Sequence, residues 1–418
     1  MNSLKLRLSF MMFLQYFIWG SWYVTMGTYL LQTRKFEGGQ VGSAYGVFAI
    51  AAMISPFFVG MIADRFFATE RIMVVLHLMG GVLVWLAAEQ THFEPFFWLL
   101  LAFQLCYVPT LALTNSLSFH HLAEVARDFP RIKIWGSFGW IVAGCLISYL
   151  LKAEDKAIQF KIASLSSFAM AFYSLTLPHT PPKNRGARVT VRDVLGLDAL
   201  KLLKSFPFAV FLVCSFLNCI PLNFYYVLAN SYFNESGMAH AGTKMTMGQV
   251  SDMVFLALMP FFLGRYGIKR MLLIGMAAWV TRYFLLAYGN NGPLVWMFYA
   301  AILVHGICYD FFFVTGHMYV DQQANEKIRG AAQGLIAFVT FGLGTYVGAR
   351  LAGETLQRYS VTAVTGAVTH DWKPIWIFPA IGAGAVMLVF ALMFRDHGAG
   401  RPVETAATEA PGSNSGHE

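Results

Sequence analysis

Long apolar stretches, separated by short polar segments, recur along the whole chain of 418 residues. Stretches of about 18 or more apolar residues are long enough to cross a bilayer as helices. Lipid offers no partner to backbone N–H and C=O groups, so these stretches should be helical throughout. We expect twelve spans, at about residues 9–31, 41–63, 72–90, 95–118, 132–151, 158–178, 206–230, 246–264, 269–288, 293–318, 330–353 and 374–394.

A polar segment divides these spans into two sets of six. Its second part, Val189–Lys204, mixes leucines with charges, as an amphipathic helix at a membrane surface does. The chain after the last span is rich in Gly, Ala, Thr, Pro and Ser, which is typical of disorder. We therefore expect an all-α membrane protein with four parts: an N-terminal six-helix half (1–178), a cytoplasmic linker with the amphipathic helix (179–205), a C-terminal six-helix half (206–397) and a disordered tail (398–418).

Composition and charge support this class and give an orientation. Hydrophobic residues make up 57% of the chain and charged residues 12%, against about 25% charged in soluble domains. Most of the 30 Lys and Arg residues fall in loops on the side of the termini, which predicts that both termini are cytoplasmic. We place the chain in a cell inner membrane, in contact with lipid. We therefore attribute the excess of Lys and Arg over Asp and Glu to membrane topology, and we expect no nucleic-acid partner.

Neither processing nor metal chemistry is indicated. The first apolar stretch is too long for a signal peptide and is followed directly by Arg34-Lys35, so it should be a permanent helix. The five cysteines all fall inside apolar spans, where we expect small packing residues and no disulfide framework or zinc site.

A weak internal repeat relates the two sets of spans. Gly60-Met-Ile-Ala-Asp64-Arg65 follows span two, and Pro260-Phe-Phe-Leu-Gly264-Arg265 follows span eight. Parallel repeats of six spans build the major facilitator fold, whose solute site lies near the membrane midplane between the halves. We expect Asp64 and Arg65 to act in gating by latching the cytoplasmic face.

One face of span five carries a charge, a hydroxyl and a ring. Lys133, Ser137 and Trp140 are spaced i, i+4, i+7, so they share a helix face. A charge at the bilayer centre costs about 2.5–3.5 kcal/mol, and such residues usually face a bundle interior or a water-filled cavity. This face can contact a polar, planar solute.

The second set of spans offers complementary groups. A stacking ring with amide and carboxylate edges suits a nucleobase and a ribose. On span ten, Asp310 should lie about 140° round the helix from His305. The candidates are Asn223 and Tyr226 on span seven, Gln249 and Asp252 on span eight, and His305, Tyr309 and Asp310 on span ten; span one adds a stripe of Gln15, Trp19 and Trp22.

Each candidate also has an ordinary structural interpretation. Aromatic residues near span ends often form interfacial belts, and amides often hold helices together. We expect Arg282 in span nine to have a packing or pairing role outside the solute path. Asp252 and Asp310 are the hardest to explain structurally, because a buried carboxylate without a partner takes up a proton. They are our candidates for proton coupling.

Local strings along the chain are similar to one known family. Seven strings, spread over nearly the whole chain, resemble the nucleoside:proton symporter family of the major facilitator superfamily: Phe13-Leu-Gln15-Tyr-Phe-Ile-Trp19-Gly-Ser-Trp22, Tyr107-Val-Pro-Thr-Leu-Ala-Leu, Asp128-Phe-Pro-Arg-Ile-Lys-Ile-Trp-Gly, Leu195-Gly-Leu-Asp-Ala-Leu, Pro260-Phe-Phe-Leu-Gly-Arg-Tyr-Gly-Ile-Lys, Tyr309-Asp-Phe-Phe and Ala332-Gln-Gly-Leu. The resemblance implies twelve transmembrane helices, a nucleoside and protons as substrates, no cofactor, no enzymatic activity and a monomer.

The resemblance also implies which residues contact the solute. They fall on Lys133, Ser137, Trp140, Gln249, Asp252, His305, Tyr309 and Asp310, with a looser match at Asn223 and Tyr226. Lys133 stands where the studied carriers have arginine, Asp252 replaces glutamate, and His305 replaces tyrosine. Asn223 and Tyr226 stand where glutamine and asparagine are expected. These differences alter the edge of the pocket that would contact the base or ribose.

We therefore expect a proton-coupled nucleoside importer that works by alternating access, with solute between the halves. Trp140 and Tyr309 would flank the base, Gln249 and Asn223 would bond it, and Lys133 would pair with Asp310 or Asp252. Four alternatives stay open: a carrier of another polar solute such as a sugar or drug, an uncoupled nucleoside facilitator, a membrane-embedded enzyme using His305, and a receptor that binds solute without moving it.

Overall fold

Helices account for nearly all of the computed structural model, which describes residues 3–58, 67–182, 197–326, 328–362 and 368–395. Within these ranges the only strands are β1 (Ser360–Thr362) and β2 (Val368–His370), which pair antiparallel. The proposed gating residues Asp64 and Arg65, most of the predicted linker and the predicted tail lie outside the described residues.

The first half is a bundle in which α1 packs on α7, α3 on α6, and α5 on both α6 and α8. Two of its helices, α2 and α7, run directly into a π-helical turn, η1 and η3 respectively. Its elements are α1 (Ser3–Gly20), α2 (Met26–Thr28), η1 (Tyr29–Thr33), α3 (Gly38–Phe58), α5 (Thr69–Glu89), α6 (Phe93–His121), α7 (Val125–Cys145), η3 (Leu146–Leu150) and α8 (Ile158–Ser174).

The second half begins after η4 (Leu197–Lys204), a short 3₁₀ helix in the predicted linker. In it α18 packs on α10 and α12, and α10 packs on α17. Its elements are α10 (Phe206–Glu235), α11 (Ala241–Met245), α12 (Met247–Tyr288), α13 (Val295–Leu303), α14 (His305–Tyr309), the π-helical turn η5 (Asp310–Val314), α15 (Thr315–Gln323), α16 (Arg329–Ala337), the π-helical turn η6 (Phe338–Gly344), α17 (Thr345–Arg358) and α18 (Trp372–Met393).

Every predicted span coincides with helical structure, but several are broken or joined. In the described part of the chain, seven helices are long and apolar enough to cross a membrane, or eight if the bent pair Val295–Leu303 and His305–Gln323 is one span. Span one is interrupted after Gly20, and α8 has 17 residues. Spans eight and nine run together in α12, where Gly267 breaks the helix at φ 69°. That left-handed conformation favours glycine.

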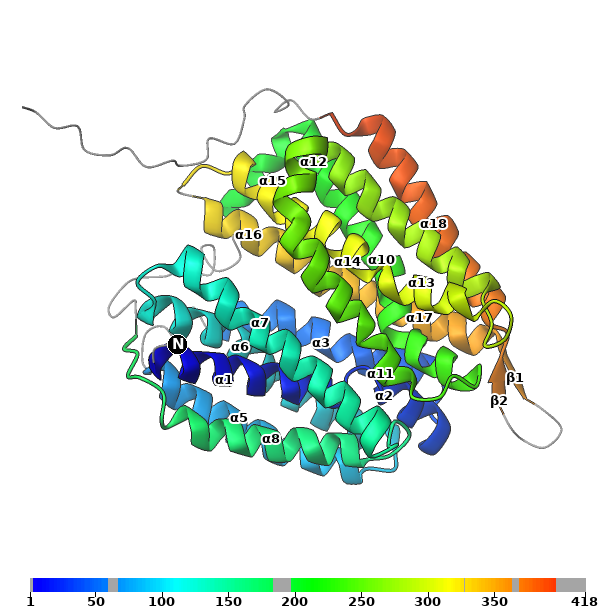
Figure 1. The fold of residues 1–418 in the computed structure, drawn as a ribbon, viewed down its shortest axis with the longest axis horizontal. Coiled ribbons are helices and arrows are strands. Elements are labelled where there is room, and N and C mark those ends of the chain that lie inside the picture. The colour runs from blue at the N-terminus through cyan, green and yellow to red at the C-terminus, as the bar shows by residue number, and fades with distance from the viewer. Residues whose placement is uncertain (1–2, 59–66, 183–196, 327, 363–367, 396–418) are drawn as a thin grey trace, which may run out of the picture.

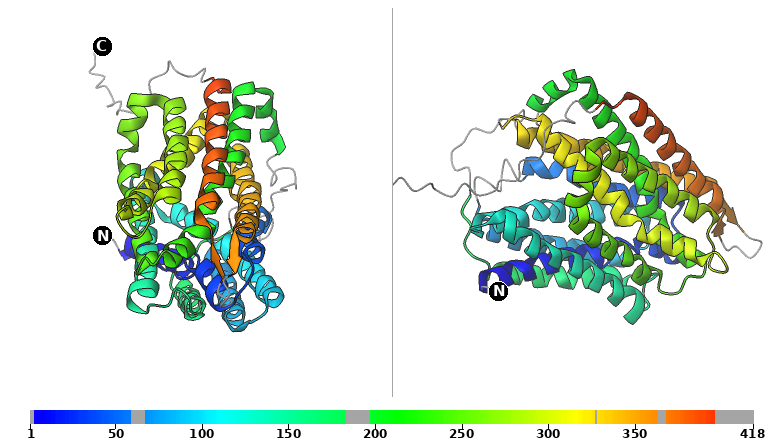
Figure 2. Two further views of the ribbon diagram at one scale, coloured as in Figure 1. Left: turned by 90° about the vertical axis from the view of Figure 1, so that its right-hand side faces the viewer. Right: turned by 45° about the horizontal axis from the view of Figure 1, so that its top comes forward.

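The two halves form separate groups of helices. Figure 1 shows residues 3–174 in a lower group, coloured blue to blue-green, and residues 206–393 in an upper group, coloured green to red. The N-terminus lies at one end of the molecule, and α2, α11 and the β1–β2 hairpin lie at the other. Both views of Figure 2 show the same division. We call the end with the hairpin the closed end, for the following reasons.

Glycines let the halves touch at the closed end. A Cβ on Gly42 of α3 would lie 2.4 Å from the carbonyl oxygen of Ala349 on α17. One on Gly353 would lie 2.3 Å from the carbonyl oxygen of Gly38. The two backbones are therefore in direct contact, which no larger residue at these positions would allow.

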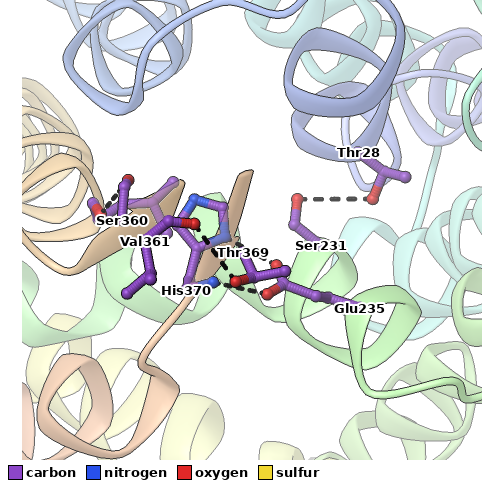
Figure 3. Close-up of polar contacts among 8 residues, drawn as sticks. Thr28, Ser231, Glu235, Ser360, Val361, Thr369 and His370 are labelled. Atoms are coloured by element: carbon purple, nitrogen blue, oxygen red, sulfur yellow. Dashed lines mark hydrogen bonds and ion pairs between the residues drawn. The ribbon is translucent and has the colours of Figure 1, made fainter. Parts of the chain in front are cut away.

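Hydrogen bonds add to this contact. Figure 3 shows Thr28 of the first half beside Ser231 of α10, with their hydroxyls 3.4 Å apart. The hairpin is anchored close by: the His370 backbone N–H donates to Glu235 Oε1 at 2.7 Å, and His370 Nδ1 lies 2.7 Å from Oε2. Within the described residues, every side-chain hydrogen bond between the halves lies at this end.

The strongest part of the closed end is a buried carboxylate. Glu154, from the segment between η3 and α8, accepts from Asn230 Nδ2 at 2.8 Å and Asn234 Nδ2 at 2.7 Å on α10. It also accepts from the backbone N–H of Gly242 at 2.9 Å and from the Ser148 hydroxyl. All four partners donate, so both carboxyl oxygens of Glu154 act as acceptors.

Glu154→Gln should open the closed end. The substitution replaces an acceptor oxygen with an NH2 group that faces donors, and unsatisfied buried groups cost about 1–3 kcal/mol. We expect spin labels at the exposed positions Gln32 and Ala239, in a cysteine-free background, to move to longer distances in the variant. Glu124→Gln, which removes an exposed carboxylate paired within its own helix region, is the control. Identical distance distributions in the two variants would contradict this role.

Candidate functional site

A cavity of about 220 Å³ lies between the two halves. Both halves contribute walls, and most of the lining side chains are aromatic or polar. The lining comprises Tyr16, Trp19, Tyr23, Phe48, Ser137 and Trp140 from the first half, and Leu222, Asn223, Tyr226, Gln249, Asp252, His305, Tyr309, Phe341 and Thr345 from the second. Eight of the predicted solute-contacting residues are therefore in one place, and they come from helices far apart in the sequence.

The first-half wall is a cluster of rings. Trp19 stacks on Phe48 with ring centres 5.1 Å apart and meets Trp140 edge to face at 5.4 Å. Tyr23 contacts Tyr226 of the second half at 6.4 Å. Aromatic rings packed in this way hold their faces in fixed positions. The cavity can therefore offer a preformed surface to a planar group.

Lys133 approaches the cavity but does not line it. Its ammonium group donates to the hydroxyl of Tyr16 and lies 4.4 Å from the centre of the Tyr16 ring. The expected ion pair between Lys133 and an acid of the second half is not formed among the described residues. Lys133 therefore acts on the cavity through Tyr16 in this conformation.

The two acids of the second half lie side by side. Asp252 of α12 lines the cavity, and its carboxyl group interacts directly with that of Asp310, which is 1% exposed. Oδ2 of Asp310 is buried and has no hydrogen-bond partner in the described part of the chain. Two neighbouring buried carboxylates are costly to keep ionised together.

Asp310 stands at the start of a π-helical turn. Helical spacing predicts that Asp310 and His305 lie on different faces of span ten, about 140° apart. The regular helix α14 ends at Tyr309, and η5 follows over Asp310–Val314. His305 and Tyr309 line the cavity, whereas Asp310 is buried and is not among the lining residues, which is consistent with the predicted difference of face.

The remaining polar candidates divide between cavity and core. Asn223 donates through Nδ2 to the carbonyl oxygen of Cys219 at 2.8 Å, which leaves its Oδ1 available at the cavity. Of the stripe on span one, only Trp19 lines the cavity. Gln15 bonds Thr110 at 2.7 Å, and Trp22 stacks on Phe160, both inside the first half. Periodicity alone could not separate these two sides of α1.

Some lining residues were not predicted. Tyr16, Tyr23, Phe48, Phe341 and Thr345 are apolar or weakly polar residues in apolar spans, so no contrast with their neighbours marked them. Arg282 was expected to lie outside the solute path, and it does not line the cavity. Its guanidinium nevertheless contacts His305, which does.

Comparison with known proteins decides the family. The model of a family described as nucleoside H+ symporter matches residues 1–399. The chain belongs to the nucleoside:proton symporter family. This confirms the predicted family, which is a family of transporters and not of enzymes.

Individual relatives match over almost their whole length. The chain is 40% identical to YegT of Escherichia coli K12 over 399 residues, covering 93% of both proteins. It is 33% identical to the nucleoside permease NupG of the same organism over 407 residues, covering 94% of this chain and 95% of the relative. The crystal structure of the nucleoside transporter NupG matches with a TM-score of 0.86 and 32% identity, over 95% of this chain and 100% of that one. The predicted major facilitator fold is confirmed, and the described helices are consistent with the twelve predicted spans.

Proposed function

We propose that this chain is an alternating-access importer that binds a nucleoside in the cavity between its halves and couples its entry to protons. The observation that carries the proposal is the Asp252–Asp310 carboxyl pair, which lies beside a cavity walled by aromatic rings. The family suggests a nucleoside as the substrate, and the cavity has aromatic and polar side chains that can bind a nucleoside. Since one chain builds both walls, we further propose that a monomer is sufficient.

The cavity suggests a role for each predicted residue. Trp140 and Tyr309 come from opposite halves and can flank a base. Asn223, Gln249 and Ser137 offer amide and hydroxyl groups to base or ribose edges. Tyr16 links Lys133 to the same wall. A solute that contacts both halves binds most tightly to the conformation in which both halves touch it. This difference in affinity between conformations is what lets solute binding drive a transport cycle.

We place both termini in the cytoplasm and the chain in the inner membrane, because most Lys and Arg residues lie in loops on that side. The closed end would then face outward, and the described conformation would be open to the cytoplasm. Asp64 and Arg65 are proposed to latch the cytoplasmic side when the molecule reverses.

Coupling would follow from the acid pair. Uptake of a proton and a solute from outside neutralises the pair and fills the cavity, so that the halves can turn inward without a buried unpaired charge. Loss of the proton to the cytoplasm restores the charge, which weakens solute binding and allows the return. An uncoupled facilitator would need no such pair.

Asp310→Asn should uncouple transport. Asparagine keeps the shape of the side chain but cannot release a proton. In proteoliposomes, we expect the wild type to accumulate radiolabelled uridine or adenosine when an inward proton gradient is imposed. The variant should accumulate at least about tenfold less solute than the wild type, but it should still exchange labelled for unlabelled solute across the membrane. Asp371→Asn, at an exposed position after the hairpin, is the control. Equal uptake by the wild type with and without the gradient would leave an uncoupled facilitator as the better description.

Trp140→Ala should weaken binding of the base. Stacking of a base on an aromatic ring is worth about 1–3 kcal/mol, so affinity should fall by about 5- to 100-fold. Competition by unlabelled uridine, adenosine and a sugar against labelled solute measures this directly. Trp98→Ala removes a tryptophan that is 64% exposed and lies outside the cavity, and it should leave affinity unchanged. Stronger competition by the sugar than by either nucleoside would favour a carrier of another polar solute.

A further inference from the structure

Arg282 is a fully buried cation that has no carboxylate partner among the described residues. It is 0% exposed. Its Nε donates to the carbonyl oxygen of Ala301 at 2.8 Å, and its guanidinium carbon lies 3.5 Å from the centre of the Tyr225 ring. A buried charge without an opposite charge is costly, so a purely structural explanation for Arg282 is weak.

The two terminal nitrogens of Arg282 both point to one atom. Nη1 and Nη2 each lie 3.2 Å from Nδ1 of His305. A guanidinium can only donate hydrogen bonds. Nδ1 must therefore present its lone pair, and the imidazole is neutral with its hydrogen on Nε2. A protonated His305 would place an N–H against the guanidinium and a second positive charge beside it.

The opposite edge of the ring is available to solute. His305 lines the cavity, and its Nε2 accepts or donates no hydrogen bond within the described residues. Nε2 is also absent from the buried polar atoms that lack a partner, so it is open to the cavity. Tyr225 and Tyr309 stack near the ring at 6.0 Å, and Tyr226 meets it edge to face at 6.3 Å. These contacts fix the orientation of the ring.

We propose that Arg282 is a positioning residue that holds His305 as a neutral imidazole with a fixed Nε2–H donor aimed into the cavity. The pocket then selects solutes that present a hydrogen-bond acceptor there, either a carbonyl oxygen or an unprotonated ring nitrogen of the base. This proposal rests on the proposed function, which supplies the nucleoside as ligand, and it adds a rule by which the pocket would distinguish one nucleoside from another. In this account the coupling proton is carried by the acids and His305 stays neutral.

The tautomer can be tested without any solute. Nitrogen NMR of the histidine-labelled protein, with His305→Gln used to assign its signal, reports which ring nitrogen carries the hydrogen. We expect the Nε2–H form in the wild type, unchanged between pH 5.5 and 8. In Arg282→Met the signal should become sensitive to pH in this range, as an ordinary imidazole is. The other titratable groups near the ring are Tyr225, Tyr226, Tyr309 and Asp252, and none of the four is substituted in this variant.

The matched variants separate this role from simple packing. Arg282→Lys keeps a donor and a charge and should preserve the wild-type spectrum. Arg270→Met, at an exposed position on the same helix, should have no effect. A wild-type signal of the Nδ1–H form, or one that titrates between pH 5.5 and 8, would overturn the proposal whether or not the chain transports nucleosides.

The selection rule is tested with solute analogues. Adenosine is compared with its 1-, 3- and 7-deaza analogues, and uridine with the analogue that lacks the 4-carbonyl oxygen. We expect one missing acceptor to weaken binding by about tenfold in the wild type and to have no further effect in His305→Phe. If each analogue binds as tightly as its parent in the wild type, the Nε2–H does not select the base. If no nucleoside binds at all, the proposed function fails instead.

Discussion

The carboxyl pair formed by Asp252 and Asp310 is the constraint on which the proposed mechanism depends. Two acids in contact inside a membrane protein cannot share that position as two anions. They must hold a proton, gain a cation or move apart. Lys133, the cation from the first half that approaches the cavity, is bound to Tyr16 in this conformation. In the proposed mechanism a proton lets the pair remain buried, and its arrival or departure would change which arrangement of the halves is stable.

The contacts between the two halves determine what such a change can do to the whole molecule. At one end the halves meet through glycine contacts and the Glu154 cluster, while the cavity lies between them. The closed end is polar as well as tightly packed, so it can separate and become hydrated without exposing a large apolar surface. Its specificity comes from donors that all converge on one carboxylate. A transporter needs a contact of this kind, which is stable in one conformation and can separate in the other.

Much of this architecture could be predicted from the pattern of apolar residues. The spans follow from hydropathy because the bilayer requires continuous helices, and the face of Lys133, Ser137 and Trp140 follows from helical spacing. The same spacing separates His305 and Tyr309, which line the cavity, from Asp310, which does not. Spacing does not predict the π-helical turn that begins at Asp310, because no local rule identifies such a turn in advance.

Other features depend on partners that are distant in the sequence. Glu154 lies in a short loop where no local pattern marks it, and its partners Asn230 and Asn234 belong to α10 of the other half. Arg282 was expected to pack away from the solute path, and its importance appears only when His305 is found against its guanidinium. The family resemblance gave the positions around the cavity. It gave neither the contact between Arg282 and His305 nor the order of the rings in the first-half wall.

The most direct test of the central claim is solute-driven proton movement. Proteoliposomes containing the protein and an internal pH-sensitive dye, with equal pH on both sides, are given external uridine or adenosine. The proposed mechanism predicts that the interior acidifies as solute enters, and that the Asp310→Asn protein shows no acidification. Entry of labelled nucleoside with no change in internal pH would contradict the role assigned to the acid pair.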